Sequence, residues 1–258
     1  MSALDSPLTY RAIALALIVA TALAWVGIVS WTPGSAAMDD MAMAPLSSVA
    51  ALGLFLLMWT IMMVAMMFPA ALPMVLIFHR VSNDRRPKGL AAVPTWVFVA
   101  GYLAVWAGFG VAFYGVEWGI RWLTGSGMAR FPATVAALAF LAAGVYQLTP
   151  LKTVCLQHCR SPMGFVMFHW REGTAGAVGM GVIHGAYCLG CCWALMVILL
   201  GVGVMNLAWI GLLTLLIFVE KVLPAGALVG RVVGGGLIAL GLLALARPSL
   251  LPLLTLGL

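Results

Sequence analysis

Charged residues are scarce in this sequence. Asp, Glu, Lys and Arg together make up 8% of the 258 residues, whereas 64% of the residues are hydrophobic. A water-soluble domain of this length has too little interior to bury so much apolar surface. The scarcity of charge therefore excludes a soluble globular protein and indicates a polytopic membrane protein.

The sequence also lacks the strict alternation of apolar and polar residues that is typical of membrane β-barrels. Because lipid offers the backbone no hydrogen-bond partners, apolar runs of the length found here must be helical. The predicted fold class is all-α. We expect a polytopic bundle of transmembrane helices that forms a single integral membrane domain, residues 1–258.

Concentrated basic patches are missing despite a net charge of +6. The basic residues stand at the ends of apolar runs, where they orient the spans, so no nucleic-acid partner is expected. The chain also has no Ser/His/Asp pattern, phosphate loop or nucleotide-binding fingerprint. These absences exclude the commonest hydrolase and nucleotide-dependent classes.

Seven apolar runs are predicted to span the bilayer, with the amino terminus in the cytoplasm. The expected spans are Ala12–Trp31, Val49 to about Phe78, Val93–Tyr114, Pro132–Leu148, Ala175 to about Leu200, Leu207–Val219 and Ala227–Ala246. Six spans remain if the first run is a signal peptide cleaved near Ser35-Ala36-Ala37. The basic residues expected on the cytoplasmic side are Arg80, Arg85, Arg86, Lys88, Lys152, Arg160 and Lys221.

Cysteines are few, and their number, five, is odd. They form two tight groups, at positions 155 and 159 and at positions 188, 191 and 192. The first group lies in an expected cytoplasmic loop, in which Gly164 to Trp170 is expected to form a short aromatic helix at the membrane surface. A disulfide framework spreads its cysteines through exposed loops, so metal binding or redox chemistry fits this clustering better.

The strongest functional signal is the apolar stretch around His184. On a helix His184, Cys188, Cys191 and Cys192 share one face, because residues three and four apart are neighbours. A lone cysteine in a membrane helix is usually a packing residue, but a histidine within the bilayer is costly and functional by default. Thiolate and imidazole ligands suit Cu(I), Zn(II) or iron.

A second soft-ligand group is Cys155-x-x-His158-Cys159, which alone is a weak motif. One site that draws on both groups and two sites along a path are both compatible with the sequence. A third group is the methionine face of the second span, with Met62, Met63 and Met66. Methionine stripes are more often packing than coordination, yet thioethers prefer Cu(I) and shift the expected metal to copper over zinc or iron.

Glu220 is the one acidic candidate for this metal site. It is expected either to support a metal ligand as a hydrogen-bond partner or to pair with Lys221 at the membrane surface. Arg231 is an alternative partner for its carboxylate.

Three motifs together resemble a bacterial family of predicted metal-binding integral membrane proteins, a domain-of-unknown-function family. They are the segment Met62 to Pro69, the segment Tyr146 to Lys152 continued by Cys155, Cys159, Arg160 and Pro162, and His184-Gly185 with Cys188 to Trp193. The resemblance extends from the second expected span to the sixth. It implies a multi-pass protein of the cell inner membrane that binds metal through Cys, His and Met residues, and it implies no reaction.

The predicted function is copper handling in the inner membrane, with Cu(I) moved across the bilayer or delivered to a cuproenzyme. The expected partners are the lipid bilayer, a metallochaperone or other membrane subunits. The alternative is a membrane metalloenzyme, an oxidoreductase subunit that uses the same residues as its metal centre on a lipophilic or small substrate. Two further alternatives are a thiol oxidoreductase based on Cys188-x-x-Cys191 and a structural subunit with inert cysteines.

Overall fold

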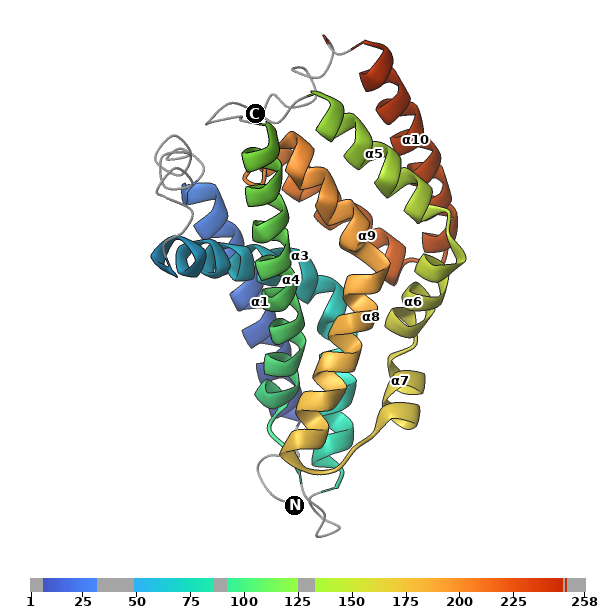
Figure 1. The fold of residues 1–258 in the computed structure, drawn as a ribbon. Coiled ribbons are helices and arrows are strands. Elements are labelled where there is room, and N and C mark those ends of the chain that lie inside the picture. Colours follow the sequence, from blue (N-terminus) through green and yellow to red (C-terminus); the bar gives the residue numbers. More distant parts are fainter. Residues whose placement is uncertain (1–6, 32–48, 86–91, 125–132, 248, 250–258) are drawn as a thin grey trace.

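Every regular element in the described part of the chain is a helix. The computed structural model describes residues 7–31, 49–85, 92–124, 133–247 and 249 (Figure 1). The helices are α1 (Pro7–Trp31), α3 (Val49–Asn83), α4 (Thr95–Thr124), α5 (Ala133–Gln147), α6 (Pro150–Arg160), α7 (Pro162–His169), α8 (Gly173–Val202), α9 (Leu207–Val222) and α10 (Gly226–Ala246). The predicted all-α fold is confirmed.

Five of these helices are long and apolar enough to cross a membrane, namely α1, α3, α4, α8 and α10. The pair α5 and α6, bent by 67° at a short break, makes a sixth span if it counts as one. The runs expected to span at 132–148 and 207–219 form helices of only 15 and 16 residues, below the roughly 20 that a bilayer requires. The described residues thus give a multi-pass membrane protein with five or six candidate spans, fewer than the seven expected.

The first expected span is one of these helices, α1, although only 11% of its most apolar stretch is buried against the rest of the protein. The proposed cleavage site around Ser35 lies outside the described residues. The cytoplasmic location of the amino terminus stays a prediction.

The segment expected to be a cytoplasmic loop is helical instead. Pro150 and Pro162 stand at the first positions of α6 and α7, where a missing backbone N–H costs nothing. Thr149 caps α6 by accepting a hydrogen bond from the Lys152 backbone nitrogen. The short aromatic helix expected at Gly164 to Trp170 is present as α7, Pro162–His169, with Phe168 87% exposed. Its location at the membrane surface stays a prediction. Because α6 packs on α8 and α7 packs on α6, the two cysteine groups come from neighbouring helices.

Two of the basic residues expected at the cytoplasmic surface are buried. Lys152 is 2% exposed and Lys221 is 7% exposed, so neither acts as a surface charge that orients a span. Both lie beside the shared core, which gathers residues of α1, α3, α4, α5, α6, α8, α9 and α10. A buried ammonium group requires an anionic or strongly polar partner.

The helices α4 and α8 approach closely because glycine faces the neighbouring backbone (Figure 1). A Cβ atom at Gly181 would overlap with the carbonyl oxygen of Phe98, and one at Gly101 with the carbonyl oxygen of Val178. Small residues at a helix contact allow such an approach in membrane proteins. This contact holds the segment with His184 and Cys188 against α4.

Gly181→Ala is expected to lower the free energy of unfolding by about 1–3 kcal/mol, because the new methyl group pushes α8 away from α4. Gly179→Ala is the matched control, since it lies on the same helix and a Cβ there meets nothing within 4 Å. Thermal unfolding in detergent measures both. Equal melting temperatures for the two variants would contradict the close contact.

Candidate metal centre

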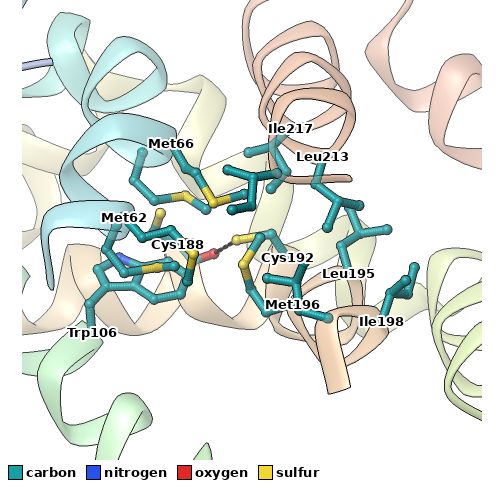
Figure 2. Packing of buried hydrophobic residues seen from close by; sticks show 14 of the residues in the cluster. Met62, Met66, Trp106, Cys188, Cys192, Leu195, Met196, Ile198, Leu213 and Ile217 are labelled. Atoms are coloured by element: carbon teal, nitrogen blue, oxygen red, sulfur yellow. Dashed lines mark hydrogen bonds between the residues drawn. The ribbon is translucent and has the colours of Figure 1, made fainter. Parts of the chain in front are cut away.

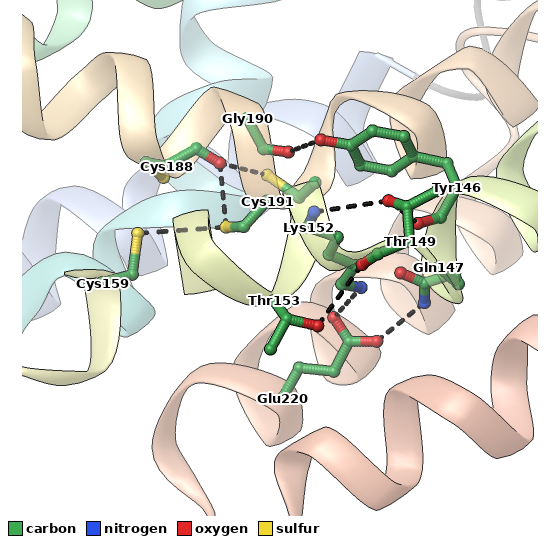
Figure 3. A network of polar contacts seen from close by, with 11 residues as sticks. Tyr146, Gln147, Thr149, Lys152, Thr153, Cys159, Cys188, Gly190, Cys191 and Glu220 are labelled. Carbon is green, nitrogen blue, oxygen red and sulfur yellow. Dashed lines mark hydrogen bonds and ion pairs between the residues drawn. The ribbon is translucent and has the colours of Figure 1, made fainter. Parts of the chain in front are cut away.

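Thiols from two helices meet in the interior of the protein. The sulfur atoms of Cys159 on α6 and Cys191 on α8 lie 3.9 Å apart (Figure 3). The thiols of Cys191 and Cys192 both donate to the backbone oxygen of Cys188, at 3.1 and 2.9 Å. This one-turn arrangement follows from the three- and four-residue spacing on a helix. The structure thus places a cysteine of each group side by side, which the sequence left open.

Cys188 contacts two polar groups from other helices. The ammonium of Lys221 on α9 lies 2.9 Å from the Cys188 sulfur, and the Tyr102 hydroxyl on α4 lies 3.0 Å from it. Sequence reasoning assigned Lys221 to the membrane surface and missed this contact. The available signal was its position within the apolar run that continues through Val222 and Leu223.

The carboxylate of Glu220 contacts different residues from those that the adjacent Lys221 contacts. Its two carboxylate oxygens accept hydrogen bonds from Lys152 at 2.6 Å and from Gln147 at 2.8 Å (Figure 3). The side chains of Glu220 and Lys152 are 2% and 3% exposed. The structure thus gives the Glu220 carboxylate to Lys152 on α6 rather than to Lys221 or Arg231. This ion pair joins α6 to α9 and, through Gln147, to α5.

His184 is buried without a hydrogen-bond partner. The residue is 3% exposed, and among the described residues neither ring nitrogen has a partner. Its ring is surrounded by the rings of Phe98, Tyr102 and Phe165 at centroid distances of 6.0, 5.5 and 5.4 Å. A buried polar group left without a partner costs about 1–3 kcal/mol, so such a group calls for an explanation.

The methionine face of α3 belongs to the same core cluster as the thiols of α8. Met62, Met63 and Met66 are fully buried, each with 0% exposure. Figure 2 shows Met62 and Met66 beside Cys188 and Cys192. Their sulfurs thus join the same contiguous interior as the thiols of α8.

Cys155 and His158 lie at the edge of this arrangement. The sulfur of Cys155 packs against α8 at Gly190, which has no side chain. A Cβ atom added to Gly190 would stand 2.7 Å from this sulfur. Tyr146 donates a hydrogen bond to the carbonyl oxygen of the same glycine. The ring of His158 stacks on Tyr187 at 4.1 Å. The soft-ligand residues thus divide between a buried sulfur cluster and a histidine at the surface of α6.

The buried sulfur centre, as we call Cys159, Cys188, Cys191 and Cys192, is not gathered around a single point. Within the described ranges, no three His, Cys, Asp or Glu side chains are grouped closely enough to hold a metal ion together. Within the centre, the sulfur atoms of Cys159 and Cys191 are in contact. Thiols in apolar surroundings favour soft metal ions, and Cu(I) accepts thioethers as well.

Comparison with known proteins gives one match. Residues 56–244 match a family model whose description is "PpoB2: Copper chaperone". The matched region includes α4 to α9 and every residue of the buried sulfur centre. No curated protein and no solved structure matches the chain.

Proposed function

The chain belongs to the PpoB2 copper chaperone family, and from this premise we propose that it binds Cu(I) inside the membrane and delivers it to a copper enzyme under assembly. Copper is the cargo of such a protein. The ion must therefore be held firmly enough to be protected, and loosely enough to be released to a partner. This requirement fits a site built from a few soft ligands.

The observation that carries the proposal is the 3.9 Å distance between the sulfurs of Cys159 and Cys191. Metal–sulfur bonds of about 2.3 Å to one ion between them would enclose an angle of roughly 115°. That angle is open enough to accept a third ligand. Bridging α6 and α8 by one ion requires no rearrangement of either helix.

Candidates for the third ligand come from α8 and α3. Cys188 is one helical turn before Cys191 and Cys192, and Met62 and Met66 supply thioethers from α3. His184, one further turn before Cys188, has an imidazole with no partner among the described residues. We propose that Cys159 and Cys191 bind the ion first and that the other groups accept it as it moves.

Glu220, a candidate residue of the metal site in the sequence, has a different role in this proposal from the support of a ligand or the pairing with Lys221 expected there. Both of its oxygens are engaged by Lys152 and Gln147. A hard carboxylate is also a poor partner for Cu(I). We therefore propose that Glu220 holds α6 in place, so that Cys159 stays opposite Cys191.

Copper analysis of the purified protein tests the proposal. Wild type is expected to bind Cu(I) through sulfur in X-ray absorption spectra, and Cys191→Ser to lose this bound copper. Cys155→Ser is the matched control, because it also removes a thiol from the α6–α8 contact but leaves the Cys159–Cys191 pair intact. Equal copper content in wild type and Cys191→Ser would contradict the proposal.

The membrane metalloenzyme stays the alternative function. A catalytic metal site keeps an open coordination position, whereas a chaperone site is emptied by transfer to a partner. A copper spectrum that changes when a small exogenous ligand is added would favour the enzyme.

A further inference from the structure

Two histidines on consecutive helices lie close together, namely His158 on α6 and His169 at the last residue of α7. The ring centres of His158 and His169 are 6.5 Å apart with an angle of 74° between the rings. Both residues are partly exposed, unlike His184. Tyr187 on α8 contacts both rings, at 4.1 Å from that of His158 and 6.1 Å from that of His169.

Each of the two rings has one nitrogen occupied by a backbone carbonyl group. The Nδ1 atom of His158 lies 2.9 Å from the oxygen of Val154, and that of His169 lies 3.1 Å from the oxygen of Phe165. Because a carbonyl oxygen only accepts hydrogen bonds, Nδ1 carries the proton in both rings. In the neutral ring Nε2 then keeps its lone pair, which is the arrangement found in histidines that bind metals.

The separation of the rings suits a single ion. Two imidazoles bound in line to one ion, with metal–nitrogen bonds of about 2.0 Å, place their ring centres about 6.3 Å apart. This in-line arrangement is the widest that one ion can bridge, and the observed distance of 6.5 Å lies at that limit, so the two Nε2 atoms must turn toward each other to bind one ion. Imidazole nitrogen is a suitable ligand for copper, and it holds the soft Cu(I) ion less firmly than thiolate sulfur does.

We infer that His158 and His169 form a second, shallower Cu(I) site through which copper enters or leaves the buried sulfur centre. The inference rests on the proposed function. His158 is followed directly by Cys159, whose sulfur faces Cys191, so adjacent residues of α6 serve the two sites. Passage is a ligand exchange in which a nitrogen–copper bond breaks, a sulfur–copper bond forms and the thiol proton is released to water. Copper remains Cu(I), and no electrons move.

Titration of the purified protein with Cu(I) tests this site. In wild type we expect sulfur coordination for the first equivalent and nitrogen coordination for the second in X-ray absorption spectra. His169→Leu and, independently, His158→Leu should weaken the second equivalent by about tenfold or more while the first keeps its sulfur spectrum. Loading of the sulfur centre from buffered Cu(I) should slow in both variants. Gln157→Leu, an exposed change on α6, is the matched control and should behave as wild type.

The outcomes separate this inference from the proposed function. Wild-type affinity and loading rate in both histidine variants would overturn the second site and leave the sulfur centre standing. A nitrogen spectrum that persists in Cys191→Ser, together with an unchanged first equivalent, would instead overturn the sulfur centre and support the histidine pair. Absence of any nitrogen coordination in wild type would also overturn the inference.

Discussion

Lys221→Met is expected to lower the affinity of the buried sulfur centre for Cu(I) by about 100-fold or more. A monovalent ion held by two thiolates leaves one net negative charge in the protein interior. The ammonium of Lys221, 2.9 Å from the Cys188 sulfur, is the group placed to compensate that charge. Leaving a buried charge unpaired costs about 3–5 kcal/mol, and each 1.4 kcal/mol changes an affinity tenfold.

Competition with a chelator of known Cu(I) affinity measures this effect. The metal-free variant should keep its melting temperature, because methionine fills a similar volume and the thiols can remain protonated without the ammonium. Arg231→Met is the matched control, since it removes a positive charge from an exposed position of α10. Equal Cu(I) affinities of Lys221→Met and Arg231→Met would show that Lys221 does not compensate the bound complex.

Glu220→Gln is expected to lower the free energy of unfolding by about 3–5 kcal/mol, because it leaves the ammonium of Lys152 buried without an anion. The Lys152 and Glu220 side chains are 3% and 2% exposed, so water cannot replace the lost partner. The glutamine side chain can still accept a hydrogen bond from Gln147. The expected loss of stability therefore comes from the missing negative charge alone. Chemical unfolding in detergent measures the change.

Removal of both charges provides the decisive comparison. The double variant Lys152→Met with Glu220→Gln should recover most of the lost stability, because no unpaired charge remains. It should nevertheless bind Cu(I) more weakly than wild type, since the link that holds α6 to α9 is weaker. A double variant as unstable as Glu220→Gln alone would mean that the ion pair is not the source of the stability.

Much of the candidate site can be predicted from the sequence. The His184 and Cys188 face of α8 follows from helical spacing, and the clustering of all five cysteines between positions 155 and 192 pointed to one region of the protein. Met62 and Met66 were identified as a buried face and lie in the same core cluster as the thiols. Helical periodicity predicts which of these residues share a face, because all of them lie on regular helices.

Partners that come from different helices were not predictable in this way. The sequence predicts surface positions for Lys152 and Lys221, because basic residues at the ends of apolar runs usually face water. The short helices α5, α6 and α9 turn these positions inward, where Lys152 meets Glu220 and Lys221 meets Cys188. The His158–His169 pair also depends on how α7 is directed after the break at Ser161 and Pro162, which the sequence marks as a break without giving its direction.

Composition and hydropathy alone determined that this is a helical membrane protein, because lipid leaves the backbone no other way to satisfy its hydrogen bonds. The spacing of cysteines, histidines and methionines determined which helix faces carry soft ligands. Only the tertiary structure decided which of those faces meet, which thiols lie opposite each other and which charges are paired. The physical reason is that contacts within a helix follow from sequence separation, whereas contacts between helices depend on how glycine, proline and buried charge let the helices approach.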